Sequence, residues 1–388
     1  MAGFWNDDYC NDNCISRAGT PKERYGEKPS LIDTLETHVV FLGAGASVPL
    51  DFPGSVDVVS QFIEFLKGDQ EEGAPDYTVL LGKISKLREQ IETNGIDFDS
   101  ESLYQCLEGY SDPPLYVRMA GPFPTIVCRE QPVKNFTADK DCLEIKTLFE
   151  EFIIKKYYRS DPQLKPATRM LVNRLLARVI GLSDWKNTLP NWKQTRFEIF
   201  TTNYDNVLEI YTDEEGLVPQ RGFKIVGGDE IVFTPDEFER APASINLYKL
   251  HGSVELSRLN NGKIISKLPP GLPGESHGSA KVVSKVMVYG IEKNVIAEPY
   301  FDLLVRLKKR LLEAKSCTIV GYSFRDPWIT QIIKDVAHNL GDFRVTYLSK
   351  AATTTLKAKA PFLTGITNCI DKALEEYLEL PSADADGG

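Results

Sequence analysis

Two short segments place small or amide-bearing residues where they could bind a ligand. Residues 43–47 (GAGAS) form a glycine-rich turn, which lets the backbone approach a phosphate while the following helix N-terminus offers free N–H groups. Residues 201–205 (TTNYD) contain Asn203, whose amide donates and accepts hydrogen bonds and can orient a water molecule or a sugar hydroxyl. Asp205 can accept from an amide or a hydroxyl. Each segment is also compatible with a structural turn, because Asn and Asp commonly cap helices.

Two further segments place a histidine and a carboxylate after apolar runs. Residues 250–253 (LHGS) contain His251, and a histidine at a strand end can exchange protons near neutral pH. Residues 321–327 (GYSFRDP) run from an apolar stretch through a glycine into a helix, a turn that could wrap the adenosine half of a dinucleotide. A lone histidine is more often structural than catalytic, and Asp326 before Pro327 fits a plain helix N-cap. Taken singly, each segment leaves a structural role open.

These segments need a common scaffold to bring them together. Apolar patterns typical of strands cover residues 38–42, 197–202, 246–250, 282–289, 317–320 and 344–348, and helical patterns cover residues 55–67, 300–313 and 327–339. Their alternation predicts an α/β fold with a Rossmann-like, mostly parallel sheet and helices on both faces. All four segments would then lie at the carboxyl edge of one sheet, where such folds bind ligands.

A helical insertion separates the first strand from the second. Apolar residues in that stretch recur at helical spacing, as in residues 80–91, and a proline-rich loop at residues 111–132 interrupts them. Asn260, Asn261 and Gly262 predict a hairpin turn, and residues 268–280 predict a loop. The predicted organisation is a polar tail (1–30), a discontinuous nucleotide-binding domain (31–67 and 195–380), a helical insertion lobe (68–194) and a C-terminal tail (381–388).

Composition excludes several classes of protein. The chain has 388 residues, 42% hydrophobic and 26% charged, which is typical of a globular protein. Its net charge of −10 disfavours direct nucleic-acid binding. We see no apolar run long enough to span a membrane and no secretory signal at the start of the sequence. Seven cysteines without a disulfide framework indicate reduced thiols in the cytoplasm.

Taken together and in this order, the four segments resemble the sirtuin family. Residues 43–47 look like its NAD-binding loop, residues 201–205 like its asparagine segment, and His251 with Gly252 like its catalytic histidine–glycine pair. Residues 321–326 resemble its later glycine–serine turn, and residues 286–293 (VMVYGIEK) resemble the strand after the histidine loop. The resemblance spans roughly residues 37–348, apart from the helical insertion.

Two departures from the sirtuin pattern narrow what the resemblance implies. Sirtuin deacylases carry a four-cysteine zinc module after the histidine, whereas no cysteine lies between His251 and Cys317 here. Cys10 and Cys14 form only a lone pair in the polar tail, so we expect no metal site. Residues 51–55 (DFPGS) replace the acidic, aromatic and arginine series of the sirtuin loop. The sequence is more similar to the sirtuin-like NAD hydrolases of prokaryotic antiviral defence, and among them to standalone subunits encoded beside a HerA-type ring ATPase.

This resemblance implies an NAD+ hydrolase that cleaves the ribose–nicotinamide bond and depletes NAD during phage infection. Asn203 would hold the water or the ribose hydroxyls, and His251 would act as general base. The residues implied to bind NAD+ are Gly43, Ala44, Gly45, Ala46, Ser47, Thr202, Asp205, Gly321, Ser323 and Ser349. Expected partners are further copies of the chain and a HerA-type ATPase, with no membrane or direct nucleic-acid contact. An NAD-dependent protein deacylase and a non-catalytic NAD-binding scaffold remain open as alternatives.

Overall fold

A computed structural model describes most of the chain after residue 35. The described residues are 36–68, 75–111, 139–161, 163–179, 195–217, 219–227, 230–240, 245–266, 276–277, 279–287, 299–314, 316–340, 344–349, 360–363, 367–370 and 374–379. All of them belong to Glu36–Gly388, the larger of the two compact units into which the chain divides. The tails predicted at residues 1–30 and 381–388, the proline-rich loop beyond Ser111 and most of residues 286–293 lie outside the described residues.

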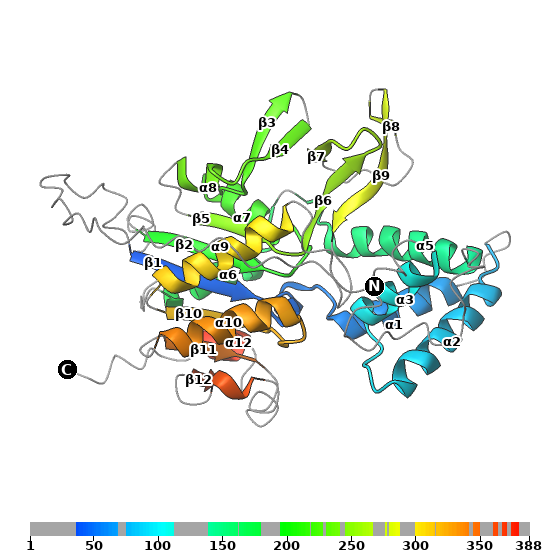
Figure 1. Ribbon diagram of the computed structural model, residues 1–388, viewed down its shortest axis with the longest axis horizontal. Helices are drawn as coiled ribbons and strands as arrows, with labels where there is room; N and C mark the ends of the chain where they lie inside the picture. Colours follow the sequence, from blue (N-terminus) through cyan, green and yellow to red (C-terminus); the bar gives the residue numbers. More distant parts are fainter. Residues whose placement is uncertain are drawn as a thin grey trace, which may run out of the picture. The chain divides into compact units, whose positions relative to one another are not determined.

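A six-stranded parallel sheet lies at the centre of this unit, in the order β12-β11-β10-β1-β2-β5 (Figure 1). Its strands are β1 (Glu36–Leu42), β2 (Thr195–Thr201), β5 (Ile245–Lys249), β10 (Ser316–Val320), β11 (Arg344–Leu348) and β12 (Thr367–Ile370). The chain leaves β1 for β2 on one side, whereas β10 pairs on the other. The order therefore reverses between β1 and β10, and the parallel sheet confirms the predicted α/β class. Folds of this class commonly bind ligands at such a reversal, beside the carboxyl ends of the strands.

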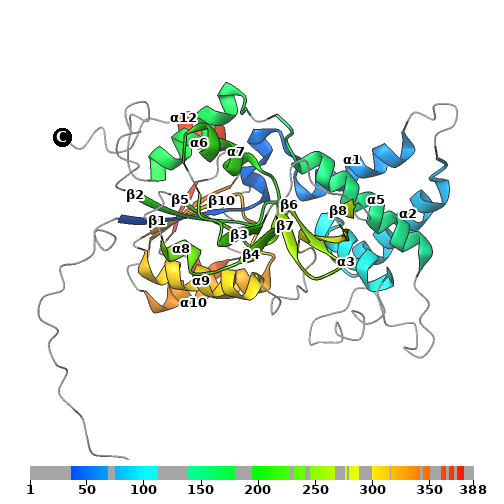
Figure 2. The same ribbon diagram turned by 90° about the horizontal axis from the view of Figure 1, so that it is seen from above.

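Helices cover both faces of this sheet (Figure 2). On one face lie α9 (Tyr300–Glu313) and α10 (Pro327–Asn339), and on the other lie α6 (Pro166–Val179), α7 (Val207–Glu214) and α12 (Leu374–Glu379). Side chains of β1 alternate between the two cores: Val39 and Phe41 pack with α9 and α10, whereas Val40 and Leu42 pack with the opposite helices. The central strand is consequently buried on both sides, which explains its continuous apolar run.

A group of helices follows β1 in the chain and lies beyond the carboxyl ends of the parallel strands (Figures 1 and 2). Its members are α1 (Ser55–Lys67), α2 (Thr78–Thr93), α3 (Ser100–Ser111) and α5 (Lys140–Tyr157), which pack against one another. The apolar residues that recur at helical spacing in α2 are all buried: Leu80, Ile84, Leu87 and Ile91. Helix α6 lies in the same predicted insertion but packs on the sheet, against α12. The boundaries of a separate lobe at residues 68–194 stay a prediction.

A second sheet was not predicted. It is antiparallel, with the order β3-β4-β7-β6-β9-β8. Its strands are β3 (Phe223–Gly227), β4 (Glu230–Phe233), β6 (Gly252–Leu259), β7 (Ile264–Ser266), β8 (Ser276–His277) and β9 (Ala280–Met287). The turn at residues 260–262 joins β6 to β7, as predicted, with Gly262 at φ 82°.

The strand predicted at residues 282–289 belongs to this second sheet and not to the parallel one, so that assignment was wrong. It pairs as β9 with β6, and β7 and β8 lie between these two strands in the chain. Antiparallel neighbours need no helical crossover, so apolar alternation alone could not assign the strand to a sheet. The loop predicted at residues 268–280 also contains β8 and the first residue of β9, and its other residues are described only at position 279. Among the helices of the described ranges, none is both long and apolar enough to cross a membrane.

Candidate functional site

The glycine-rich turn after β1 interlocks with the turn after β10. The amide of Gly43 donates to the carbonyl of Val320 (2.9 Å), and that of Gly45 donates to the carbonyl of Gly321 (3.0 Å). Gly321 has φ 60°, and a Cβ there would lie 2.5 Å from the carbonyl carbon of Gly45. A Cβ at Gly43 would lie 2.6 Å from the carbonyl oxygen of Gly321. Glycine is therefore required on both sides of the contact.

The glycine-rich turn does not lead directly into a long helix, and α1 begins at Ser55, as predicted. Two short 3₁₀ turns, Ala44–Ala46 and Val48–Leu50, precede α1. Ala44 and Gly45 are exposed, whereas Gly43, Ala46 and Ser47 are buried. The amide of Ala46 is already bonded to the carbonyl of Gly43 (2.9 Å). The exposed backbone at Ala44 and Gly45 is consequently the part of this loop that a ligand can approach.

Asn203 is held against the glycine-rich turn by its amide nitrogen. Its Nδ2 donates to the carbonyl of Gly43 (3.0 Å) and to Oγ of Ser47 (2.8 Å). A backbone carbonyl only accepts hydrogen bonds, so the nitrogen and not the oxygen of the amide must face Gly43. Within the described residues, no hydrogen bond reaches Oδ1 of Asn203. The acceptor end of this amide is thus available to a ligand hydroxyl or a water molecule.

Asp205 belongs to the same hydrogen-bond network, through Ser47. Its Oδ2 accepts from Oγ of Ser47 (2.7 Å), and its Oδ1 accepts from the amide of Val207 (3.2 Å) at the start of α7. The side chain is buried. Both carboxylate oxygens are therefore engaged within the protein, and the contact with a nicotinamide amide stays a prediction. Thr202 lies on the same strand end, where its amide donates to the carbonyl of Leu42 (3.1 Å).

His251 pairs with a carboxylate that was not among the predicted site residues. Its Nε2 lies 3.1 Å from Oδ2 of Asp326, and both side chains are buried. Oδ1 of Asp326 accepts from the amides of Trp328 (3.0 Å) and Ile329 (3.1 Å). From the sequence, Asp326 had only the signature of a helix cap, and that role is confirmed. Nothing in the sequence indicates that its second oxygen faces a histidine 75 positions earlier.

Lys249 is a second side chain that the sequence did not single out. Its Nζ donates to the backbone carbonyl of Asp205, lies 3.3 Å from Oγ of Ser253, and forms an ion pair with Glu209 (2.8 Å). Burial raises the pKa of Glu209, and the neighbouring charge of Lys249 opposes that rise. Lys249 therefore connects the loop of Asn203 to the loop of His251. Its only sequence signal was a charged residue within an apolar strand.

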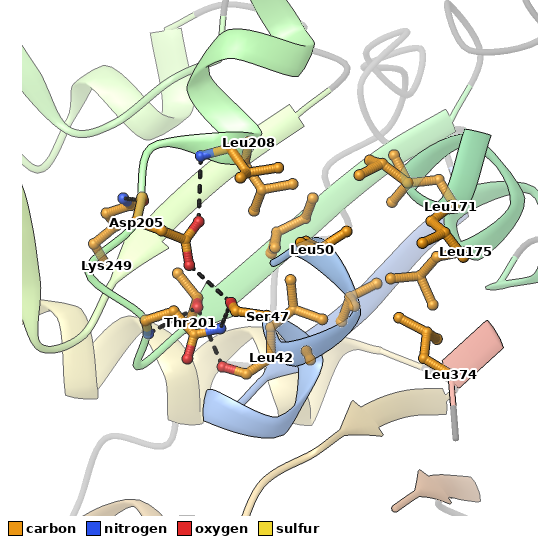
Figure 3. A pocket seen from close by; sticks show the side chains of 17 residues that line it. Leu42, Ser47, Leu50, Leu171, Leu175, Thr201, Asp205, Leu208, Lys249 and Leu374 are labelled. Carbon is orange, nitrogen blue, oxygen red and sulfur yellow. Dashed lines mark hydrogen bonds between the residues drawn. The ribbon is translucent and has the colours of Figure 1, made fainter. Parts of the chain in front are cut away.

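A cavity of about 40 Å³ lies beside these side chains (Figure 3). Its polar wall includes Ser47, Thr201, Asn203, Asp205 and Lys249, and its apolar wall includes Leu50, Leu171, Leu175, Leu208 and Leu374. That volume holds roughly three water molecules at about 10–15 Å³ each.

Leu50 lines that cavity, and the segment of residues 50–53 is held by side chains at the end of α5. Arg159 donates to the carbonyl of Leu50, and its guanidinium lies 4.9 Å from the ring centroid of Phe52. The hydroxyl of Tyr157 donates to the carbonyl of Pro53 (2.9 Å). Arg159, just after α5, therefore contacts the cavity wall at Leu50, and Tyr157 of α5 holds the segment that follows Leu50. A change in their position would reach the site through these bonds.

The remaining predicted residues lie at the turn after β10 and at the end of β11. Ser323 is exposed, and its Oγ lies 3.4 Å from Nε of Arg325, which also pairs with Asp99 at the start of α3. Ser349 is half-buried and follows β11 directly. The amide of Gly321 donates to the carbonyl of Leu348 (2.8 Å), which brings the carboxyl ends of β10 and β11 together. All predicted site residues thus lie at the carboxyl edge of the parallel sheet, although their roles are untested.

Metal ligands do not cluster in the described part of the chain, where no three His, Cys, Asp or Glu side chains are arranged to hold an ion. Cys106, Cys142 and Cys317 are buried free thiols. Burial raises the pKa of Cys142 to about 12, so this thiol stays protonated at neutral pH.

Part of the site lies within a range that matches a known family model. Residues 198–361 match the family model of the SIR2-like domain, a range that includes Asn203, His251 and Asp326 but not the glycine-rich turn. Among solved structures, a Sir2 homologue bound to NAD is similar at 12% identity and a TM-score of 0.39, covering 90% of each chain. A mutant Sir2 homologue bound to ADP-ribose is similar at 13% identity and a TM-score of 0.41, covering 91% of this chain and 94% of that one. No curated protein matches the sequence.

Proposed function

We propose that this chain is an NAD+ glycohydrolase, which converts NAD+ and water into ADP-ribose, nicotinamide and a proton. One observation carries the proposal. The free acceptor end of Asn203 and the buried pair of His251 and Asp326 lie at the sheet edge where two glycine turns interlock. The match of residues 198–361 to the SIR2-like domain supports the same class of chemistry.

The backbone of this edge suits a dinucleotide. We infer that the pyrophosphate lies against the exposed backbone of Ala44 and Gly45, where the packing of Gly43 against Gly321 leaves no room for side chains. The adenosine half then lies towards Ser323 and Ser349, across the turn after β10. This arrangement directs the nicotinamide end towards Asn203 and the cavity beside it.

The reaction demands little of the leaving group. Nicotinamide carries a positive charge in NAD+, and breaking its bond to ribose neutralises that charge, so no acid is needed. The ribose passes through an oxocarbenium-like transition state. Oδ1 of Asn203 accepts a hydrogen bond from a ribose hydroxyl or from the attacking water and fixes its position. His251 accepts the proton that the water or the hydroxyl loses.

Release of nicotinamide from NAD+ by the purified protein tests this proposal. Asn203→Ala and His251→Ala are each expected to slow release by at least about 100-fold. His338→Ala is the matched control, because this histidine is exposed in the last turn of α10, at the opposite end of that helix from Asp326. Absence of release from the wild-type protein, alone and with a HerA-type ATPase, would refute the hydrolase. Equal rates in all variants would refute the assigned residues.

The same assay separates the alternatives. A protein deacylase would release nicotinamide only when an acyl-lysine peptide is added, and a scaffold would bind NAD+ without releasing nicotinamide. We further propose that the chain acts as an effector of antiviral defence, as an oligomer assembled with a HerA-type ATPase. The hydrogen bond from Arg159, just after α5, to the carbonyl of Leu50 supports control by such a partner, because it links the end of a helix to the cavity wall. Loss of cellular NAD during phage infection, abolished by Asn203→Ala, is the expected result.

A further inference from the structure

We propose that Asp326 is a positioning residue that holds His251 in one tautomer and orients its ring for proton transfer. This inference rests on the proposed glycohydrolase, because it assigns a partner to the base of that reaction. This role is separate from the helix cap, because the two oxygens of Asp326 have different partners. Oδ1 caps α10 and Oδ2 faces Nε2 of His251 at 3.1 Å.

The geometry of Asp326 leaves its carboxylate no freedom to turn. Two amides, of Trp328 and Ile329, hold Oδ1 at 3.0 and 3.1 Å, and Pro327 fixes the first backbone angle of α10. The N-terminus of a 13-residue helix also favours a negative charge at this position. Oδ2 is consequently presented to His251 as a fixed, ionised acceptor.

An ionised carboxylate only accepts hydrogen bonds, and this decides the state of the imidazole. Nε2 of His251 must carry the proton that bonds to Oδ2 of Asp326, so Nδ1 is the ring nitrogen that can take up a proton. After the transfer, the carboxylate stabilises the imidazolium across a 3.1 Å hydrogen bond in a buried setting. A carboxylate that selects a tautomer in this way is worth orders of magnitude in rate in hydrolases.

Asp326→Asn separates the two roles of this residue. Asparagine caps helices as well as aspartate does, so its side-chain oxygen replaces Oδ1. Its NH₂ group replaces Oδ2 and cannot accept from Nε2–H, so the bond forms only if the histidine adopts the other tautomer. We expect kcat for nicotinamide release to fall about 10²–10⁴-fold with KM for NAD+ nearly unchanged.

The chain contains a closely matched control. Asp139 caps α5 through Oδ1, with the amides of Asp141 and Cys142 each at 3.1 Å, and its Oδ2 pairs with Lys83. Asp139→Asn therefore keeps a cap and removes a second-oxygen contact away from the site. It is expected to leave kcat unchanged. An equal fall in kcat in both variants, or no fall in Asp326→Asn, would overturn the proposal.

A spectroscopic measurement keeps the inference testable without turnover. In ¹⁵N NMR of the imidazole nitrogens, wild-type His251 should show the Nε2–H tautomer, and Asp326→Asn should shift it towards Nδ1–H. Asp326→Ser, which retains a cap but lacks the carboxylate, should show a mixture. Unchanged tautomer populations in both variants would refute the positioning role. Failure of the wild-type protein to release nicotinamide would instead refute the glycohydrolase and leave this spectral test to decide on Asp326.

Discussion

Gly321→Ala is expected to damage the site because it separates the two interlocked glycine turns. Gly321 lies at φ 60°, and a Cβ there would lie 2.5 and 2.6 Å from the carbonyl carbon and Cα of Gly45. It would also press against the amide nitrogen of Ala46. These are backbone atoms, so no side chain can rotate away. Relief requires that residues 43–47 or the end of β10 move.

The loss of stability in Gly321→Ala has two parts, and the same substitution at Gly262 allows them to be measured separately. A left-handed φ costs a non-glycine residue about 1–2 kcal/mol, and overpacking costs about 1–3 kcal/mol more. Gly262 in the hairpin of the second sheet has φ 82°, but a Cβ at this position would have no heavy atom within 4 Å among the described residues, so Gly262→Ala carries only the first part. We therefore expect Gly321→Ala to reduce the free energy of unfolding by about 2–5 kcal/mol and Gly262→Ala by about 1–2 kcal/mol.

Thermal unfolding and nicotinamide release measure the two consequences. At roughly 1–3 °C per kcal/mol for a chain of this size, Gly321→Ala should melt several degrees below Gly262→Ala. Its nicotinamide release should fall more than about 10-fold, because the displaced loop is the one assigned to the pyrophosphate, whereas Gly262→Ala should retain activity. Equal melting temperatures, or equal activities, would show that the two glycine turns do not constrain each other as described.

Three further predictions concern the surroundings of the site. Ser47→Ala removes the 2.7 Å donor to buried Asp205 and should cost about 2 kcal/mol in chemical denaturation, whereas the exposed control Ser60→Ala should cost nearly nothing. Arg159→Met removes the donor to the carbonyl of Leu50 and should cost about 1–2 kcal/mol; Arg88→Met, another arginine over an aromatic ring but exposed, should cost less, and equal losses would contradict the latch on the cavity wall. Burial raises the pKa of Glu239, but the hydrogen bond and the charge of Arg310 more than offset this rise, together with neighbouring cations. The net result is a pKa of about 2, below the ordinary value of 4.5. Since the folded-state pKa is depressed, its contribution to stability is present above about pH 4.5 and disappears as the pH falls towards 2; Glu239→Gln should flatten acid unfolding in that window, and an unchanged profile would contradict the ion pair.

Local patterns were sufficient to predict three helices with their bounds. The predicted ranges 55–67, 300–313 and 327–339 coincide with α1, α9 and α10 at both ends. Each has an apolar stripe at helical spacing, and α10 begins with Asp326 and Pro327, a strong start signal. Information within one turn of the chain determines such boundaries, so no knowledge of the fold was needed.

Sheet membership could not be predicted in the same way. The strand pattern near residue 282 was correct, but its partner is β6 in an antiparallel sheet. Alternation of apolar side chains shows that a strand has a buried face, not which strand lies beside it. The orientation of side chains in the site could not be predicted either. Asn203 and Asp205 were expected to bind a ligand, yet their orientation depends on Ser47, 156 and 158 positions away in sequence.

The sequence by itself determined the class of fold and the segments that gather at the sheet edge. These follow from periodicity, glycine and capping residues, which act over a few neighbouring positions. Only the tertiary structure decided that Gly43 and Gly321 exclude a side chain from each other, and that Asp326 uses one oxygen for a helix and the other for His251. Contacts of that kind depend on distances of a few ångströms between segments far apart in the chain, which packing fixes and no local pattern records.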